Sequence, residues 1–339
     1  MAGGARMNRP SDLTLGCRPF TPSSCRVVVL GGGVMGPGIS LVFAEHGFTV
    51  DLCDISETAA ATAATTLRDA IALKAELGFL PAASASAVFD RIRIRVGTED
   101  ALAGADFVIE AVSENRNVKS AVYRDISRLG APGVVVWSNT STMNVFELAP
   151  DALRNRLIVA HWFAPPHILP LVELVGEGPV HATLMAEADA ILKSLGKAPV
   201  KLEKFVPGFI INRLLRALGR EAFDLIESGA ITTENLDIAV RTSLAPRMQI
   251  LGLMQRYDFT GLNLSLRNLE DRAIVDAPIN LAPPSLVDRV GRGELGVTTG
   301  KGFYDYQGRS LAEMQRLRDT KLWQVVKGVG DLVSDPRPL

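Results

Sequence analysis

The feature that most constrains this chain of 339 residues is a glycine-rich segment, GGGVMG at residues 31–36, placed between a strand pattern and a helix pattern. Residues 26–30 read RVVVL, a short β-branched run typical of a buried parallel strand, and residues 37–47 carry apolar side chains at helical spacing. In such a unit the first glycine permits a tight turn, the second lets the backbone approach a pyrophosphate, and the third lets helix and strand pack closely. The context therefore predicts a dinucleotide whose phosphates lie at the N-terminus of the helix.

An acidic residue ends the next strand pattern, where residues 49–54 read TVDLCD. A carboxylate at Asp54 can accept hydrogen bonds from both hydroxyls of the adenosine ribose, and it repels a 2′-phosphate. We therefore expect NAD rather than NADP as the cofactor. The alternative interpretation of the loop and Asp54 is a structural turn with a solvated carboxylate.

Further strand patterns alternate with helical ones through the first two thirds of the chain. The alternation predicts an α/β fold, a Rossmann-type doubly wound sheet, and after residue 205 the patterns become helical, which predicts an all-α C-terminal domain. We expect a flexible N-terminal extension over residues 1–23, an NAD-binding Rossmann domain over residues 24–204 and a helical substrate and dimerisation domain over residues 205–339. A targeting role for the extension stays open. The expected strands are residues 92–96, 107–111, 134–138 and 157–160, with 172–175 and 200–203 at the far edge of the sheet.

The composition argues against several classes of partner. Hydrophobic residues make up 47% and charged residues 22%, which is typical of a globular protein, and the net charge of −1 gives no basic surface for nucleic acid or an anionic membrane. Cys17, Cys25 and Cys53 lack CxxC spacing, which favours reduced thiols in the cytoplasm. No Cys/His cluster has metal-ligand spacing, so we expect no metal.

Four polar residues follow the strands in an order that suits alcohol oxidation. Ser141 follows one strand in the run SNTS, His161 closes the next, Glu173 lies inside an apolar strand pattern, and Asn212 opens the helical domain. Oxidation of a secondary alcohol needs a base for the hydroxyl proton, for which histidine is suited, and a carboxylate can fix its tautomer. Singly, the histidine could end a strand, the serine could cap a helix and the asparagine could lie on a helix surface. A carboxylate in an apolar strand needs a partner, and the set together favours catalysis.

These motifs resemble the 3-hydroxyacyl-CoA dehydrogenase family over residues 25–306, from the glycine loop to GKGFYD at residues 300–305. The resemblance implies that His161 is the base, Glu173 its partner, and Ser141 and Asn212 the ligands of the substrate oxygen. It also implies a homodimer through the C-terminal helices and a place in fatty-acid metabolism. The expected cofactor-binding residues are Gly31, Gly33, Val34, Met35, Gly36, Asp54, Glu110, Ala111, Val112, Glu114, Lys119 and Asn139.

The resemblance weakens where fatty-acyl members bind CoA. Their helical hairpin after the second strand is rich in lysine, whereas residues 55–92 here hold few bases, Arg68, Lys74 and Arg91. The runs PPH at residues 165–167 and PLVE at residues 170–173 are more similar to the branch acting on free hydroxy acids, which includes gulonate 3-dehydrogenase, lambda-crystallin and carnitine dehydrogenase. Arg247 aligns with an arginine of that branch and could hold a free carboxylate, or it could be a surface or dimer-interface residue.

We therefore expect an NAD-dependent enzyme that reversibly oxidises the 3-hydroxyl of a 3-hydroxyacyl thioester or a free 3-hydroxy acid. The sequence leaves the choice between thioester and acid open. A non-catalytic dinucleotide-binding protein of the crystallin type is a second possibility. A dehydrogenase of the 3-hydroxyisobutyrate type ranks low, because that group uses a catalytic lysine where this chain has Asn212 and Arg213.

Overall fold

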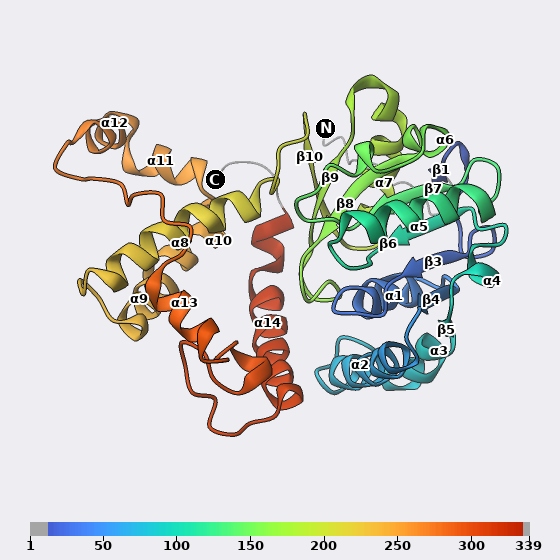
Figure 1. Cartoon of the computed structure of the whole chain (residues 1–339), viewed down its shortest axis with the longest axis horizontal. Helices are drawn as coiled ribbons and strands as arrows, with labels where there is room; N and C mark the ends of the chain where they lie inside the picture. The colour runs from blue at the N-terminus through green and yellow to red at the C-terminus, as the bar shows by residue number, and fades with distance from the viewer. Residues whose placement is uncertain (1–12, 335–339) are drawn as a thin grey trace, which may run out of the picture. The chain divides into compact units, whose positions relative to one another are not determined.

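The computed structural model describes residues 13–334, which form two compact units that divide between Ile210 and Ile211 (Figure 1). The first unit is built around an eight-stranded sheet, in the order β10-β9-β8-β7-β6-β3-β4-β5. All neighbouring strands are parallel except β8 and β9, which pair antiparallel. The strands are β3 (Val27–Leu30), β4 (Val50–Asp54), β5 (Ile92–Val96), β6 (Phe107–Glu110), β7 (Val135–Ser138), β8 (Leu157–Trp162), β9 (Leu171–Val175) and β10 (Ala198–Leu202).

The chain winds outward in two directions from β3, which gives the expected doubly wound sheet. It passes from β3 to β4 and β5 on one side and then returns to β6, β7 and β8 on the other. The direction changes between β3 and β6, and ligands of open α/β sheets bind at the carboxyl ends of the strands at such a point. The topology therefore places the candidate site at the edge formed by Leu30, Glu110 and Ser138.

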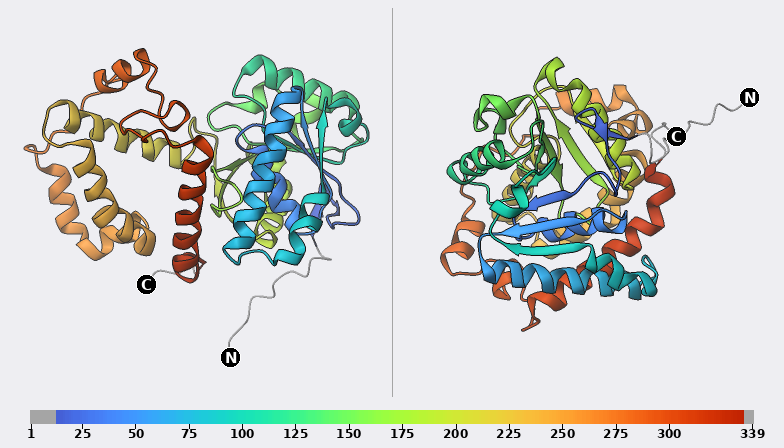
Figure 2. Two further views of the ribbon diagram at one scale, coloured as in Figure 1. Left: turned by 90° about the horizontal axis from the view of Figure 1, so that it is seen from below. Right: turned by 90° about the vertical axis from the view of Figure 1, so that its right-hand side faces the viewer.

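Helices cover both faces of the sheet, as the turned views show (Figure 2). The side chains of Val27 and Val29 join one buried cluster with α1 (Gly36–Glu45), α2 (Glu57–Glu76), α3 (Ala85–Asp90) and α7 (Ala182–Ser194). The alternate residues Val28 and Leu30 join the other cluster with α4 (Glu99–Leu102), α5 (Arg116–Leu129) and α6 (Asp151–Arg154). Strands that are apolar on both faces are what a sheet buried in this way requires.

The prediction of a flexible extension over residues 1–23 is wrong for residues 13–23, and residues 1–12 lie outside the described part of the chain. Strands β1 (Thr14–Leu15) and β2 (Arg18–Pro19) form a small hairpin. Phe20 is fully buried, and its ring stacks on Phe48 with centroids 4.7 Å apart. Because Phe20 fills an aromatic cluster of the sheet domain, the segment folds with that domain.

The second unit is helical, with α8 (Ile211–Glu227) and α14 (Leu311–Ser334) its longest helices. Few of its described residues are buried, and many large apolar side chains are exposed. Within residues 13–334, no helix is both long and apolar enough to span a membrane. The remaining helical segments are α9 (Thr233–Ala239), η5 (Val240–Leu244), α10 (Ala245–Leu251), α11 (Met254–Thr260), α12 (Leu262–Glu270), α13 (Pro284–Gly291) and η6 (Val297–Thr299).

Candidate active site

The glycine loop joins β3 to α1 and is shaped for close backbone contact. Gly31 has φ of 111°, and a Cβ there would collide with the backbone of Ala111, which follows β6. A Cβ at Gly36 would likewise overlap the carbonyl of Gly31. At Gly33 an added Cβ would meet no described protein atom within 4 Å, so the space before this backbone is open to a ligand. The three glycines therefore fit the roles expected of a dinucleotide loop.

Asp54 lies at the carboxyl end of β4 and is tied to the glycine loop. Its Oδ2 accepts from the backbone N–H of Gly32 at 2.8 Å, and its Oδ1 accepts from that of Ser56 at 2.9 Å. The carboxylate is partly exposed. This arrangement fits a residue that binds ribose hydroxyls, because the remaining lone pairs of the oriented carboxylate can still accept hydrogen bonds.

Glu110 ends β6 and is the centre of a buried polar network. Its Oε1 accepts from Lys119 Nζ at 2.7 Å and from the backbone N–H of Val112 at 3.0 Å. Its Oε2 accepts from the hydroxyls of Tyr123, at 2.6 Å, and Ser138, at 2.7 Å. Burial, with Glu110 beside it, raises the pKa of Tyr123 well above its usual value, so the phenol stays a donor. The buried carboxylate is thus fully engaged, as its burial requires.

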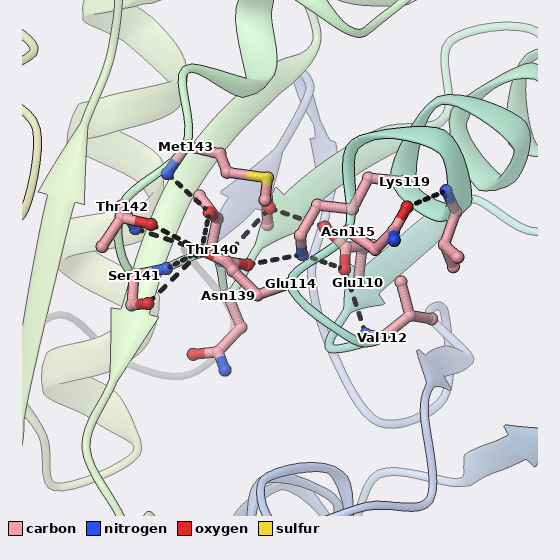
Figure 3. Close-up of polar contacts among 12 residues, drawn as sticks. Glu110, Val112, Glu114, Asn115, Lys119, Asn139, Thr140, Ser141, Thr142 and Met143 are labelled. Atoms are coloured by element: carbon pink, nitrogen blue, oxygen red, sulfur yellow. Dashed lines mark hydrogen bonds and ion pairs between the residues drawn. The ribbon is translucent and has the colours of Figure 1, made fainter. Parts of the chain in front are cut away.

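A second carboxylate, Glu114, connects this network to the loop after β7 (Figure 3). Its Oε2 lies 3.3 Å from Lys119 Nζ. Its Oε1 accepts from the hydroxyl of Thr140 at 2.7 Å, and from the backbone N–H groups of Ser141, at 3.0 Å, and Thr142, at 3.1 Å. Burial raises the pKa of Glu114, but the Thr140 hydroxyl, Lys119 and the two backbone donors outweigh it and hold the pKa at about 2. The loop carrying Ser141 is therefore fixed by an ionised side chain.

His161 and Glu173, the pair that the sequence predicts to be catalytic, lie in contact. They are facing residues of the antiparallel pair β8 and β9, and His161 Nδ1 lies 2.8 Å from Glu173 Oε2. A carboxylate can only accept, so Nδ1 is the donor in this bond, and Nε2 takes no part in it. The histidine side chain is 7% exposed and that of the glutamate 0%. A buried carboxylate behind an imidazole is the arrangement of a general base and its orienting partner.

Aromatic rings and a backbone donor hold this pair in place. Phe163 and Phe209 lie against the imidazole, with ring centroids 4.5 Å and 5.5 Å away. The backbone N–H of Ile210 donates to Glu173 Oε1 at 3.0 Å. Asn139 Oδ1 accepts from the backbone N–H of Trp162 at 2.8 Å, which joins the loop after β7 to the strand that carries His161. The pair is therefore preorganised by its own unit.

The remaining predicted residues are distributed as follows. Val34 is 80% exposed and Met35 is half-buried at the start of α1. Asn212 lies in α8 and Arg247 in α10, both in the second unit, and their roles stay predictions. Arg247 donates to the backbone carbonyl and the hydroxyl of Ser243.

Each basic residue of the helical hairpin after β4 has an intramolecular partner. Lys74 is buried in an ion pair with Glu45, and the guanidinium of Arg68 lies over the ring of Phe89 at 4.8 Å. Arg91 donates to the backbone carbonyl of Ala44. Each of these cations therefore already has a contact within the first unit.

Three residues of this polar network, Tyr123, Ser138 and Thr140, were not predicted from the sequence. Tyr123 lies four residues after Lys119 on α5 and both are buried, a spacing that places them on one helix face. Glu110 inside an apolar strand was the signal that such partners had to exist. Thr140 and Ser138 gave no comparable signal, since either hydroxyl could end a strand.

The chain is similar to known dehydrogenases along most of its length. It matches the family described as 3-hydroxyacyl-CoA dehydrogenase, NAD binding domain, over residues 26–205, and 3-hydroxyacyl-CoA dehydrogenase, C-terminal domain, over residues 208–306. It is 32% identical to 5-formyl-3-hydroxy-2-methylpyridine 4-carboxylate 5-dehydrogenase of Mesorhizobium japonicum, over 87% of this chain and 95% of that protein. It is 31% identical to L-carnitine dehydrogenase of Pseudomonas aeruginosa, over 88% and 92%.

The chain is also similar to a relative named for a coenzyme A substrate and to a solved structure. The chain is 30% identical to human mitochondrial hydroxyacyl-coenzyme A dehydrogenase, over 83% of this chain and 91% of that protein. The crystal structure of 5-formyl-3-hydroxy-2-methylpyridine 4-carboxylic acid 5-dehydrogenase, an NAD+-dependent dismutase, has a TM-score of 0.80 at 29% identity and covers 92% and 99% of the two chains. With both of its domains matched, this chain belongs to the NAD-binding 3-hydroxyacyl-CoA dehydrogenase family.

Proposed function

We propose that this protein is an NAD-dependent dehydrogenase in which His161 removes the proton of a substrate 3-hydroxyl. The observation that carries the proposal is the buried His161–Glu173 contact of 2.8 Å at the sheet edge that holds the glycine loop. A neutral imidazole with an unprotonated Nε2 can accept a proton near neutral pH. The carboxylate of Glu173 then stabilises the imidazolium that results.

The bound cofactor supplies the acceptor for the substrate hydride. The residues of the chain do the rest: Ser141 and Asn212 hold the substrate oxygen, and Glu114 fixes the loop from which Ser141 projects. Hydrogen-bond donors aimed at an oxygen on which charge develops contribute directly to the rate. Expulsion of water from the site would strengthen these bonds.

We propose further that the preferred substrate is a free hydroxy acid rather than a CoA thioester. Two observations support this choice. The basic residues of the hairpin after β4 are engaged within the protein, and two relatives with high coverage are named for free carboxylates, carnitine and a pyridine carboxylate. Arg247 would pair with the substrate carboxylate in this account. Fatty-acid metabolism would follow only from the thioester alternative.

A substrate panel tests the proposal. NADH formation would be followed with carnitine, gulonate, other free 3-hydroxy acids and several 3-hydroxyacyl-CoAs, and the reverse reaction with acetoacetyl-CoA. We expect higher kcat/KM with a free acid and a selective rise in its KM for Arg247→Gln. Preference for a thioester would reject the free-acid choice, and no turnover with either class would favour the non-catalytic alternative.

We also propose a homodimer formed through the C-terminal helices and a cytoplasmic location. Support for the dimer comes from the large exposed apolar side chains of the helical unit, such as Leu262, Leu266 and Leu269 on α12. Apolar surface of this extent is usually covered by a partner. Support for the location is the set of free thiols at Cys17, Cys25 and Cys53.

A further inference from the structure

Three charged side chains meet at the carboxyl ends of β6 and β7. Lys119 lies between two carboxylates, 2.7 Å from Glu110 Oε1 and 3.3 Å from Glu114 Oε2. Glu110 and Lys119 are buried, with side chains 0% and 1% exposed. The Glu114 side chain is 34% exposed. The opposite charges of Glu110 and Lys119 cancel, so the three side chains together have one net negative charge. The partly exposed carboxylate of Glu114 bears this charge.

The charge of Glu114 is held in a fixed place. Besides the three short hydrogen bonds described above, its Oε1 is 3.3 Å from the hydroxyls of Ser141 and Thr142, so donors of three successive residues converge on one oxygen (Figure 3). Such a convergence stabilises the ionised form and prevents the side chain from moving away when a ligand arrives. Glu114 therefore acts on its surroundings as a fixed charge.

A bound dinucleotide would bring its nicotinamide half to the carboxyl ends of β6 and β7, where Glu114 lies. Asp54, at the end of β4, would hold the adenosine half on one side of the glycine loop. The nicotinamide half would then extend over the ends of β6, β7 and β8, toward a substrate held near His161. Glu114, Ser141 and His161 all lie at the ends of these strands or directly after them.

The two redox forms of the cofactor differ in charge at that ring. The oxidised nicotinamide carries a positive charge, and the reduced ring is neutral. A fixed carboxylate nearby attracts the first and is nearly indifferent to the second, so it interacts differently with the two ligands. A charge several ångströms away in partly solvated surroundings changes a binding constant by about one order of magnitude.

We propose that Glu114 sets the redox preference of the site, so that NAD+ binds more tightly relative to NADH than it would without this carboxylate. The proposal rests on the NAD-dependent function proposed above and adds a preference between the two cofactor forms to it. The carboxylate favours occupancy of the site by NAD+ and eases release of NADH, and it stabilises bound NAD+ against reduction. Glu114 is therefore a determinant of the cofactor form as well as a support for Ser141.

The test measures binding, without turnover. Kd values for NADH, from its fluorescence, and for NAD+, from competition, would be compared in the wild type, Glu114→Gln, Glu114→Ala and Glu114→Asp. We expect both neutral variants to shift the ratio of Kd(NAD+) to Kd(NADH) upward by about five- to twentyfold, and Glu114→Asp to retain the wild-type ratio even if both affinities fall. Glu147→Gln removes an exposed carboxylate, 62% exposed beside Arg116, and serves as the matched control with no expected change.

The outcomes separate this inference from the function on which it rests. Equal loss of affinity for both forms in the neutral variants would make Glu114 a purely structural residue and overturn the inference, while the dehydrogenase proposal would stand. The same holds if Glu114→Asp shifts the ratio as far as Glu114→Gln. Failure of the wild-type protein to bind either form would overturn the proposed function itself. Thermal unfolding of each variant confirms that the compared proteins are folded.

Discussion

At the scale of single residues, the site depends on contacts made across strands. His161 and Glu173 meet because they are facing residues of β8 and β9, and Ile210 supplies the donor for the second carboxylate oxygen. A shift of the register by one residue would turn either side chain to the other face of the sheet. The register of the strand pair therefore decides whether His161 and Glu173 can meet.

Replacing Glu173 by Gln tests this contact. The amide keeps the size of the side chain but cannot stabilise an imidazolium, so we expect kcat to fall by about 10²–10⁴. Affinity for NAD+ should stay within about twofold, because Glu173 binds no cofactor in this account. Steady-state kinetics and a fluorescence titration check the two parts. A variant with wild-type kcat would show that the pair is structural.

Lys197 gives a pH dependence of stability. Its Nζ donates to the backbone carbonyls of Pro166 and Leu169, at 2.6 Å and 3.1 Å, in the connection between His161 and Glu173. Burial, with Lys74 nearby, lowers the pKa of Lys197 from 10.5 to about 7. Between these values the unfolded chain binds more protons than the folded one, so stability rises with pH by up to about 1.4 kcal/mol per unit.

Lys197→Met isolates this contribution. The free energy of unfolding of the wild type minus that of the variant should increase from about pH 7 to about pH 10 and stay constant below pH 7. Urea unfolding at several pH values measures it. A difference that does not vary with pH would contradict the lowered pKa in the folded protein.

The polar residues themselves and the pairing of His161 with Glu173 could be predicted from the sequence, but the remaining partners could not. His161, Glu173, Ser141 and Glu114 follow from position at strand ends and from the family resemblance. Glu114 accepts hydrogen bonds from the backbone N–H groups of Ser141 and Thr142, and the directions of these groups cannot be predicted from a residue pattern. Lys197 reads as an ordinary lysine after a helix.

At the scale of elements, the N-terminal hairpin is secured by one helix. Glu187 on α7 accepts from Thr14 Oγ1 at 2.7 Å and from the backbone N–H groups of Gly16, at 2.8 Å, and Cys17, at 3.1 Å. The side chain is nearly buried, with the residue 8% exposed. The carboxylate replaces the backbone partners that such a short hairpin lacks.

Glu187→Ala should destabilise the first unit by about 2–3 kcal/mol, since it leaves backbone donors unsatisfied. The matched control is Asp189→Ala on the same helix, which removes ion pairs with Lys193 and Lys201 and should cost less than about 1 kcal/mol. Denaturant unfolding, with proteolysis of the hairpin as a second readout, compares the two. Equal effects would mean that the hairpin is not secured by Glu187.

The positions of the strands of the main sheet could be predicted from the sequence, but the antiparallel direction of β9 could not. The apolar runs of β3, β4 and β6, together with the glycine loop, are sufficient to predict a βα unit from sequence alone. The antiparallel entry of β9 carries no sequence signal, because a strand buried on both faces has the same apolar run in either direction. The hairpin of residues 14–19 was missed because its strands are two residues long.

At the scale of the whole molecule, the helical unit exposes large apolar side chains that a second subunit could cover. On α12, Leu262 is 63% and Leu269 78% exposed. Burying each such side chain in an interface would stabilise the dimer by about 25 cal/mol per Å² of apolar surface removed from water. We expect sedimentation of the wild type to give the mass of a dimer.

Charges introduced on α12 should weaken that dimer. Leu262→Glu combined with Leu269→Glu is expected to shift the sedimenting species toward the monomer by at least about tenfold in Kd, because a buried charge is costly at an interface. Val180→Glu replaces a residue of the first unit that is 52% exposed, and it should leave the mass unchanged. A wild-type monomer at all concentrations would contradict the proposed dimer.

The division into a sheet unit and a helical unit could be predicted, because the strand patterns stop near residue 205. Asn212 and Arg247 belong to the second unit, and their functions stay predictions. The contact between His161 and Glu173, by contrast, lies within the first unit.

NADH formation by the His161→Gln variant tests whether His161 acts as the base. We expect the rate with the best substrate of the panel to fall by about 10²–10⁴ while NAD+ still binds, because glutamine can bond Glu173 but cannot accept the proton. His46→Gln, at the exposed end of α1, should keep wild-type turnover. Wild-type turnover by His161→Gln would contradict the account.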